Sequence, residues 1–252
     1  MDISLTGRRA LVTGGSRGVG AAVARMLAAA GAQVGIAYRS RHDEAAALVR
    51  ELEEAGVSAW SHAGDLSRPD EVERLFNRAL DEFGGLDIFV GNAGIWQPEH
   101  VPVALMSDDQ WRGTLAANLD SIFYCTRGSA RIMSDGGRIV LVGSTAGQRG
   151  EAGHADYAAT KGAMIAFVKG VCVELAAHDI TVNCVAPGWI DTEMTIKPYE
   201  GGGRSRIEAS IPLGRVASAN DVAGPIVFLC SEYARHITGE VLNVNGGSVL
   251  AG

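Results

Sequence analysis

The stretch RALVTGGSRGVG at residues 9–20 joins a short apolar run to a cluster of glycines, and the helix-like segment AAVARMLAAAG follows at residues 21–31. Gly14, Gly18 and Gly20 allow the backbone to turn tightly and to approach a ligand. The start of the predicted helix offers free N–H donors and the positive end of a dipole, which suit a pyrophosphate. A strand, a glycine loop and a helix in this order are typical of the first turn of a dinucleotide-binding fold. A glycine turn that serves packing alone is the alternative.

Six further apolar runs alternate with segments of helical spacing along the rest of the chain. The runs are QVGIAY (33–38), SAWSHA (58–63), LDIFVG (86–91), GRIVLVG (137–143), ITVNCVA (180–186) and EVLNVNG (240–246). Strands that are apolar on both faces and alternate with helices form a parallel sheet with helices on each side. The sequence therefore predicts an α/β fold of the Rossmann type, with a doubly wound, parallel, seven-stranded sheet.

The chain of 252 residues contains no Pro- or Ser-rich linker, repeat or block of charge. We therefore expect a single domain over residues 1–252. The least regular stretch is 187–212, which is rich in Gly, Pro and Thr. Because long irregular segments in compact domains are usually functional, we interpret residues 189–212 as a mobile lid over the substrate, with Gly201–Gly203 as its hinge.

The overall charge and composition exclude several classes of protein. The formal net charge is −7, whereas nucleic acids and anionic membranes select clustered Lys and Arg, so a small-molecule substrate is favoured. No apolar run reaches the roughly 18 residues of a membrane span, and the N-terminus lacks the apolar stretch of a signal peptide, so we expect a soluble cytoplasmic protein. Neither the four cysteines nor the six histidines have metal-ligand spacing. We predict no metal site and interpret the cysteines as reduced core residues.

The end of the second predicted strand, IAYRSR at residues 36–41, bears on the choice of dinucleotide. An acidic residue there would bond the ribose 2′-hydroxyl of NAD, whereas this chain has Tyr38 followed by Arg39. Arg17 lies in the glycine loop on the same side of the predicted sheet. Two guanidinium groups that converge on one ribose suit a dianionic 2′-phosphate, so we predict NADPH/NADP+ over NADH. The alternative is that Arg39 and Arg41 are ordinary solvated charges.

A second cluster begins in HADYAATKG at residues 154–162. Tyr157 and Lys161 are four residues apart on a predicted helix and therefore share a face. Ser144 follows the fifth predicted strand and emerges at the carboxyl edge of the sheet, where ligands of such folds bind. An adjacent ammonium favours the tyrosinate, and a shift of the tyrosine pKa from about 10 to about 7 requires roughly 4 kcal/mol. We expect Lys161, together with the charge of an oxidised nicotinamide, to lower the pKa of Tyr157.

Further short features stand in a characteristic order along the chain. With the glycine loop they comprise TGGSRGVG (13–20), GDL (64–66), GNAG (91–94), Asn118, Ser144, Tyr157 with Lys161, APG (186–188) and TGEVLNVNGG (238–247). In these features, and over essentially its whole length, the sequence resembles the short-chain dehydrogenase/reductase family in its single-domain form. The family's commoner NNAG is GNAG here, so Gly91 replaces the first Asn, a difference that bears on the fourth strand rather than on the chemistry.

The resemblance implies where a nicotinamide cofactor binds. It places Asp65 and Leu66 beside the adenine, residues 92–94 behind the adenosine ribose, and Thr192 near the nicotinamide. With the residues already described, the expected cofactor-binding set is Gly14, Ser16, Arg17, Gly18, Val19, Gly20, Tyr38, Arg39, Ser40, Asp65, Leu66, Asn92, Ala93, Gly94, Tyr157, Lys161, Pro187, Gly188, Ile190 and Thr192.

The resemblance also implies an oxidoreductase whose catalytic residues are Asn118, Ser144, Tyr157 and Lys161. Ser144 orients and polarises a carbonyl oxygen, and Tyr157 delivers the proton that accompanies hydride transfer from the nicotinamide. Lys161 holds the nicotinamide ribose, and Asn118 holds a water that connects Lys161 to solvent. The expected reaction is the reversible reduction of a ketone to a secondary alcohol. A sensor that binds NADPH without chemistry is the rival, because fold alone does not fix function.

The substrate is the least constrained part of this prediction. PLGR (212–215), DVA (221–223) and the C-terminal motif resemble the 3-oxoacyl-[acyl-carrier-protein] reductases in particular. Those enzymes usually place basic residues near the site mouth for the acidic carrier, at positions where this chain has Asp135 and His178. Because these are poor docking groups for an acidic partner, we favour a free ketone, with a carrier-bound 3-oxoacyl substrate as the alternative.

Separate loops are expected to supply the substrate cleft. The expected lining is Trp96, Ser144, Gln148, Arg149, Glu151, His154, Tyr157, Trp189 and Met194. For Arg149, Glu151 and His154 a solvated surface position is the alternative. The helices predicted around 107–131 and 154–178 carry more apolar surface than one sheet face requires, and the family resemblance suggests that they pack in a homotetramer.

Overall fold

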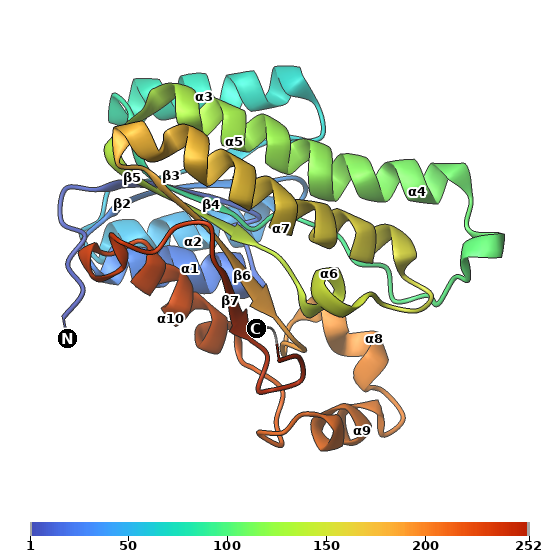
Figure 1. The fold of residues 1–252 in the computed structure, drawn as a ribbon. Helices are drawn as coiled ribbons and strands as arrows, with labels where there is room; N and C mark the ends of the chain where they lie inside the picture. The colour runs from blue at the N-terminus through green and yellow to red at the C-terminus, as the bar shows by residue number, and fades with distance from the viewer. Residues whose placement is uncertain (1, 251–252) are drawn as a thin grey trace.

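The computed structural model of the chain describes residues 2–250. Its centre is one seven-stranded sheet in the order β3-β2-β1-β4-β5-β6-β7, in which all neighbouring strands are parallel (Figure 1). The strands are β1 (Arg9–Thr13), β2 (Gln33–Tyr38), β3 (Ala59–Ala63), β4 (Leu86–Gly91), β5 (Met133–Val142), β6 (Thr181–Pro187) and β7 (Val241–Val244). The seven predicted runs therefore all form strands of a single sheet.

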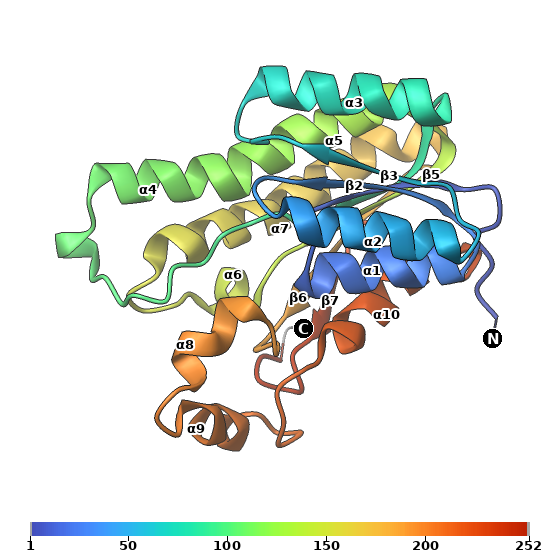
Figure 2. The ribbon, with the colours of Figure 1, turned by 180° about the vertical axis from the view of Figure 1, so that it is seen from behind.

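Helices cover both faces of this sheet (Figures 1 and 2). One face carries α1 (Gly18–Ala29), α2 (His42–Glu54) and α10 (Ala219–Leu229), and the other carries α3 (Pro69–Phe83), α5 (Ser121–Ile132) and α7 (Ala155–Leu175). Successive strand residues point to opposite faces, so Val12 belongs to the apolar core beneath α1 and α10 while Leu11 belongs to the core beneath α3, α5 and α7. The predicted doubly wound Rossmann-type fold is confirmed.

The strand order places a crevice at one edge of the sheet. β1 pairs with β2 on one side and with β4 on the other, so successive connections leave β1 and β4 in opposite directions. Ligands of such folds bind outside the carboxyl ends of the strands at this reversal. The fifth strand was predicted at 137–143 but begins four residues earlier, at Met133. Met133 pairs with Leu86, and the pairing then shifts register to the Ile88–Arg138 pair.

The helix predicted around 107–131 contains a local change of winding. α4 (Asp108–Leu115) runs into a π-helical segment (Ala116–Asp120), which continues as α5. Asn118 lies within the π segment and is fully buried. Single π turns inside α-helices occur frequently at functional sites, so the π turn supports a functional role for Asn118.

The segment predicted as an irregular lid is more ordered than its composition indicates. It contains a 3₁₀ turn (Glu193–Thr195), α8 (Ile196–Tyr199) and α9 (Gly203–Ser210), which lie on the same side of the molecule as α6 (Thr145–Arg149) (Figures 1 and 2). Gly201 and Gly202 have φ values of +56° and +79°, in the left-handed region that favours glycine. They lie in the connection between α8 and α9, and their role as a hinge stays a prediction.

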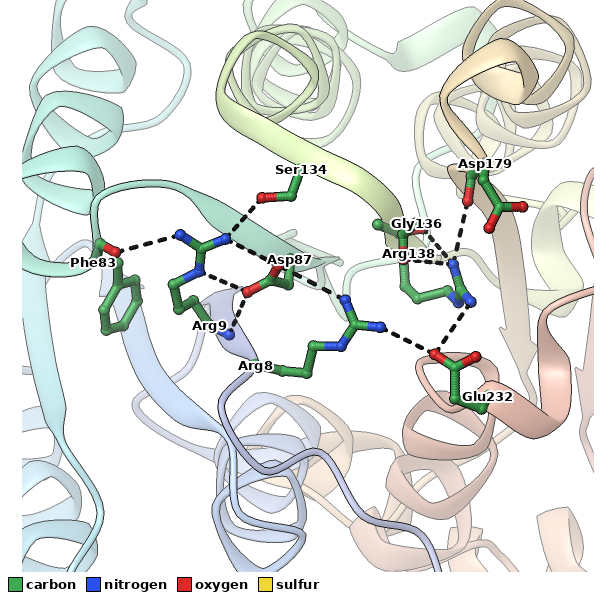
Figure 3. Close-up of polar contacts among 10 residues, drawn as sticks. Arg8, Arg9, Phe83, Asp87, Ser134, Gly136, Arg138, Asp179 and Glu232 are labelled. Atoms are coloured by element: carbon green, nitrogen blue, oxygen red, sulfur yellow. Dashed lines mark hydrogen bonds and ion pairs between the residues drawn. The ribbon is translucent and has the colours of Figure 1, made fainter.

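A polar network ties together the opposite, amino-terminal ends of the strands (Figure 3). Arg9 donates from Nε to Asp87 Oδ2 at 2.6 Å and from Nη2 to Asp87 Oδ1 at 3.0 Å. Arg8 and Arg138 both contact Glu232, at N–O distances of 3.0 and 3.7 Å. Although burial raises it, the hydrogen bonds from Arg9 and the charges of Arg9 and Arg8 hold the pKa of Asp87 below its usual value. The network joins β1, β4 and β5 to the turn that follows α10.

Candidate active site

A cavity of about 380 Å³ opens at the carboxyl edge of the sheet. This volume is within the usual range for small-molecule sites. The glycine loop, the loops that follow β2, β4, β5 and β6, and the lid contribute to its wall. The predicted residues that line it are Gly14, Ser16, Arg17, Gly18, Val19, Tyr38, Arg39, Ser40, Asp65, Leu66, Asn92, Ala93, Gly94, Trp96, Ser144, Arg149, Glu151, Tyr157, Lys161, Pro187, Gly188, Trp189, Ile190, Thr192 and Met194.

The glycine loop is shaped by close backbone contacts. Gly14 and Gly18 have φ values of +64° and +54°, which side chains rarely tolerate. A Cβ on Gly20 would lie 2.2 Å from the carbonyl oxygen of Gly14, so α1 can begin against the loop only because this position is glycine. Gly20 thus supports the wall from behind and does not line the cavity, whereas Gly18 opens α1 at the wall and presents its first backbone N–H groups.

Residues at the end of β4 hold this loop in place. The Asn92 side chain donates from Nδ2 to the carbonyl oxygens of Thr13 and Gly14, at 3.0 and 3.2 Å. The Thr13 hydroxyl accepts the backbone N–H groups of Asn92 and Ala93, at 3.0 and 3.1 Å. These contacts fasten the turn after β1 to the turn after β4, so the predicted GNAG segment builds the floor of the cavity through its hydrogen bonds.

Three arginines gather where β2 ends. Arg17, Arg39 and Arg41 line the same cavity, and Arg17 and Arg41 both contact Glu193 of the lid, the latter at 3.3 Å. Although burial raises it, the hydrogen bonds from Ser67 and the charge of Arg39 contribute to holding the pKa of Asp65 below its usual value. A glycine cradle at one place and three guanidinium groups beside the ribose position fit a phosphorylated dinucleotide.

Three of the four predicted catalytic residues, Ser144, Tyr157 and Lys161, face the same cavity from two elements. Ser144 follows β5 and caps the short helix α6, where its hydroxyl accepts the N–H of Ala146 at 3.1 Å. Tyr157 and Lys161 stand one turn apart on α7, with Lys161 Nζ 5.8 Å from the centre of the Tyr157 ring. Lys161 Nζ donates to the carbonyl oxygen of Val142 at 2.7 Å. This bond ties the lysine to the end of the strand that carries Ser144.

Burial shifts the pKa values of Tyr157 and Lys161 in opposite directions. It raises the pKa of Tyr157 to about 12, against a lowering by the neighbouring Ser144 hydroxyl. It lowers the pKa of Lys161 to about 8. Burial is the main cause of the raised pKa of Tyr157 in the protein by itself. The expectation that Lys161, together with the charge of an oxidised nicotinamide, lowers this pKa stays a prediction for the complex with the cofactor.

Asn118 is placed behind the cavity wall. Its Oδ1 accepts the N–H of Ile95 at 2.7 Å, and its Nδ2 donates to the Ile95 carbonyl at 2.9 Å. A Cβ on Gly94 would lie 3.1 Å from Asn118 Oδ1 and 3.7 Å from Lys161 Nζ, so the three residues meet at one point. Asn118 thus fixes the loop after β4 next to Lys161. The water that it is expected to hold stays a prediction.

The substrate side of the cavity is aromatic. Trp96 and Trp189 line it and meet edge to face, with ring centres 6.0 Å apart. Met194 also lines it and is 44% exposed. His154 was expected in the lining but is not part of it, because its ring stacks against Trp96 at 4.7 Å between centres and is almost completely buried. His154 therefore supports a wall residue.

Gln148 is also absent from the cavity lining, contrary to the prediction. Its Nε2 donates to Asn243 Oδ1 at 2.7 Å, which ties α6 to β7. In a helix of five residues, Gln148 is only one position from Arg149, which does line the cavity. Adjacent helical residues point about 100° apart, so the sequence alone did not determine which of them faces the substrate.

The two positions used to argue against an acidic carrier lie far from the cavity of their own chain. His178 Nδ1 lies 3.0 Å from Asp135 Oδ1, and both side chains are exposed. Asp135 is near the amino end of β5, whereas Ser144 follows its carboxyl end. The regular part of the strand from Arg138 to Ser144 alone spans roughly 20 Å, and Asp135 lies beyond its far end. The premise that these side chains flank the site mouth is therefore wrong within one chain.

Part of the cavity lining lies outside the residues predicted from the sequence. The additional residues are Ala37, Arg41, Gly64, Ser67, Ile95, Ala117, Ser121, Val142, Gly143, Thr145, Glu193 and Thr195. Most of them adjoin predicted residues at strand ends, so the common carboxyl edge was a usable signal. Ala117 and Ser121 flank the predicted Asn118, but the side chains that reach the cavity there depend on the π-helical winding of residues 116–120, which the sequence did not indicate.

The described residues form neither a metal-binding cluster nor a membrane-spanning helix. Among residues 2–250, no three His, Cys, Asp or Glu side chains are grouped so that they could hold a metal ion. No helix of that part of the chain has the length and apolar character required to cross a membrane.

The chain is similar to known proteins over nearly its full length. A protein-family model described as Enoyl-(Acyl carrier protein) reductase matches residues 14–248. The chain is 40% identical over 250 residues to the 3-oxoacyl-[acyl-carrier-protein] reductase FabG of Vibrio cholerae, which covers 98% of this chain and 100% of that relative.

Solved structures agree with this similarity. A short-chain dehydrogenase/reductase described as a glucose/ribitol dehydrogenase, from Brucella melitensis, matches with a TM-score of 0.94 at 33% identity and covers both chains completely. A short-chain dehydrogenase from Burkholderia cenocepacia, in complex with NADP, matches with a TM-score of 0.92 at 38% identity and covers 97% of this chain and 98% of its own. With a doubly wound sheet and a cleft that unites the glycine loop with Ser144, Tyr157 and Lys161, the chain belongs to the short-chain dehydrogenase/reductase family and is an NAD(P)-dependent oxidoreductase related to the 3-oxoacyl-[acyl-carrier-protein] reductases.

Proposed function

We propose that the protein reduces a ketone to a secondary alcohol with NADPH, by reversible hydride transfer. The observation that carries this proposal is that Ser144, Tyr157 and Lys161 line the same cavity as the glycine loop. NADPH supplies the hydride when it is bound. The protein supplies the proton and the position of the carbonyl group.

Tyr157 acts as the proton donor in the reduction. With its pKa raised to about 12, the phenol keeps its proton throughout the neutral range. A protonated phenol is the form required when a developing alkoxide takes up a proton. Ser144, whose hydroxyl lies beside Tyr157, donates a hydrogen bond to the same carbonyl oxygen and stabilises the charge that develops there.

Lys161 orients the cofactor ribose and contributes charge to the site. Its pKa of about 8 means that the ammonium form predominates at neutral pH. Asn118 acts as a positioning residue, because its two hydrogen bonds to Ile95 fix the loop beside Lys161. The proposed relay of protons from Lys161 to solvent passes a water held near Asn118.

NADPH is proposed as the preferred cofactor because Arg17, Arg39 and Arg41 line the cavity where β2 ends. A 2′-phosphate at this position gains charge-assisted hydrogen bonds that a 2′-hydroxyl does not. The Burkholderia cenocepacia protein, 38% identical to this chain, was solved in complex with NADP, which supports this choice.

We propose a free ketone with an apolar or aromatic substituent as substrate. Trp96, Trp189 and Met194 supply apolar surface beside the catalytic residues, and aromatic walls recognise planar groups. Asp135 and His178 no longer contribute to this choice. The second candidate is a 3-oxoacyl-[acyl-carrier-protein] reductase, which is favoured by the 40% identity to the Vibrio cholerae enzyme.

A panel of substrates distinguishes these functions. NADPH consumption by the purified protein is measured with 3-oxoacyl thioesters and with free aryl, cyclic and aliphatic ketones. We expect the highest kcat/KM with an aryl ketone. A strong preference for thioesters would establish the carrier-linked alternative, and binding of NADPH without oxidation by any carbonyl compound would establish a sensor.

A further inference from the structure

Glu193 of the lid holds two of the three arginines that surround the proposed 2′-phosphate position. Its Oε2 forms an ion pair with Arg17 Nη1 and lies 3.3 Å from Arg41 Nη2. Arg17 comes from the loop before α1, and Arg41 is the residue that precedes α2. A single lid carboxylate thus bridges two loops that both belong to the wall of the cofactor cleft.

We propose that Glu193 is a cofactor-specificity residue whose carboxylate competes with the 2′-phosphate for Arg17 and Arg41. By this competition, Glu193 weakens the binding of the phosphorylated cofactor and couples its arrival to the position of the lid. The proposal rests on the NADPH preference proposed above. It assigns to the lid a part in choosing the cofactor in addition to its part in covering the substrate.

The backbone around Glu193 keeps the carboxylate close to the arginines. Thr192 and Thr195 form a capping box around the 3₁₀ turn that Glu193 begins. The Thr195 hydroxyl also donates to the Ile190 carbonyl at 2.6 Å, which fastens the turn to the segment that follows β6. Thr192 Cγ2 lies 3.5 Å from the position that a Cβ on Gly18 would take. The turn therefore lies directly on the glycine loop, and Glu193 points from it toward Arg17.

The charges of the two cofactors explain why this contact discriminates between them. A 2′-phosphate carries about two negative charges, so it and the Glu193 carboxylate repel each other when they share Arg17 and Arg41. NADPH must therefore separate Glu193 from at least one arginine. NADH has a neutral 2′-hydroxyl at this place, which leaves both ion pairs intact. The cost of the exchange falls on NADPH alone.

The size of the effect follows from the exposure of the ion pairs. The side chains of Arg17, Arg41 and Glu193 are 46%, 47% and 50% exposed. Ion pairs at this exposure are individually weak. Disruption of two of them, together with the added repulsion, corresponds to roughly fivefold to tenfold weaker binding of the phosphorylated cofactor.

A second ion pair of the lid provides a matched control. Lys197 Nζ of α8 lies 2.6 Å from Glu99 Oε1, in the loop that follows β4. This contact fastens the lid as the Glu193 contacts do, but it touches none of the arginines at the ribose position. Glu193→Gln and Glu99→Gln each remove one carboxylate charge from a lid ion pair, and they differ in whether the partner is a phosphate-binding arginine.

The experiment measures dissociation constants by calorimetry for 2′,5′-ADP and ADP, and by tryptophan fluorescence for NADPH and NADH. For Glu193→Gln we expect 2′,5′-ADP and NADPH to bind fivefold to tenfold more tightly than to the wild type, and ADP and NADH to change by less than about twofold. For Glu99→Gln we expect the ratio of the two affinities to stay at the wild-type value. Unfolding midpoints of both variants check that the fold is retained.

The possible results separate this proposal from the proposed function. If the wild type prefers 2′,5′-ADP but Glu193→Gln leaves the ratio unchanged, or Glu99→Gln raises it equally, Glu193 does not compete for the phosphate. If neither the wild type nor Glu193→Gln distinguishes 2′,5′-ADP from ADP, the NADPH preference itself is wrong. Because binding is measured directly, neither result depends on the identity of the ketone.

Discussion

Tyr157 illustrates how the surroundings of a side chain decide its chemistry. A tyrosine and a lysine one turn apart suggest an ammonium that stabilises a phenolate. In the folded protein Lys161 is buried and Tyr157 is partly buried, and the pKa of Tyr157 is raised to about 12 while that of Lys161 is lowered to about 8. The protein by itself thus holds Tyr157 in the form that donates a proton, which suits the direction of ketone reduction.

Replacing Tyr157 tests this role at the scale of one residue. We expect Tyr157→Phe to lower kcat at least a hundredfold, because the variant keeps the ring but lacks the donated proton. NADPH affinity, measured by tryptophan fluorescence, is expected to stay within about twofold of the wild type. Tyr233→Phe, which removes the same hydroxyl from an exposed ring in the turn after α10, is a control that should leave kcat unchanged. Near-normal turnover in Tyr157→Phe would contradict the assignment.

At the scale of the element, the glycine loop and α1 depend on each other. α1 begins at Gly18, and Gly20 lies inside its first turn with no room for a side chain, because a Cβ there meets Gly14 O and Asn92 Nδ2. The same amide donates to Gly14 O, so loop, helix and the turn after β4 form one packed unit. Helix propensity alone would favour alanine at Gly20.

The variant Gly20→Ala therefore separates packing from propensity. We expect it to weaken NADPH binding at least tenfold, because the Cβ would lie 2.2 Å from Gly14 O and must push the loop away. Gly170→Ala on α7 is the matched control, since nothing lies within 4 Å of its Cβ. It is expected to be neutral or stabilising by up to about 1 kcal/mol. Equal NADPH affinity in the two variants would show that the loop tolerates the extra atom.

The elements also indicate which sequence signals can be trusted. Six of the seven predicted strands lie within a few residues of their observed bounds, because parallel strands buried on both faces are continuous apolar runs. The amino end of β5 was missed, because MSDG at residues 133–136 is polar and pairs only through Met133. The lid helices were missed because α8 is only four residues long and α9 is rich in Gly, Arg and Ser.

At the scale of the whole molecule, the carboxyl and amino ends of the strands have different roles. The carboxyl edge carries the cleft, and the amino edge carries the network around Asp87 (Figure 3). Exposed apolar side chains, including Trp111, Phe123 and Val173, lie on α4, α5 and α7. They are consistent with the homotetramer suggested by the family resemblance, which stays a prediction that light scattering can test.

The Asp87 network makes the stability of the whole fold depend on pH. The pKa of Asp87 is lower in the folded protein than in the unfolded chain. The stability that its carboxylate contributes is therefore fully present above the unfolded pKa of about 3.9 and is lost as the pH falls through the lower folded pKa. We expect Asp87→Asn to lower the free energy of unfolding by about 1–3 kcal/mol at neutral pH. In urea denaturation, the difference from the wild type is expected to shrink below about pH 4.

Asp70→Asn provides the comparison for this experiment. Asp70 pairs with Arg68 and Arg74 on the exposed surface, where solvent screens ion pairs, so its removal is expected to change stability much less than the removal of Asp87 does. A difference between Asp87→Asn and the wild type that stays constant from neutral to strongly acidic pH would mean that the carboxylate charge is not what the network uses.

The sequence by itself determined the seven-stranded sheet, the glycine loop and the spacing of Tyr157 and Lys161, because each depends on residues close together in the chain. Only the tertiary structure decided that Gln148 bonds to Asn243 and that the His154 ring stacks against Trp96. It also decided that Asp135 lies at the opposite end of β5 from Ser144. It alone brought Glu193 to Arg17, 176 residues away in the chain. Such contacts, and the burial that sets the pKa of Tyr157, arise when distant segments pack together, and no local pattern specifies which side chains then meet.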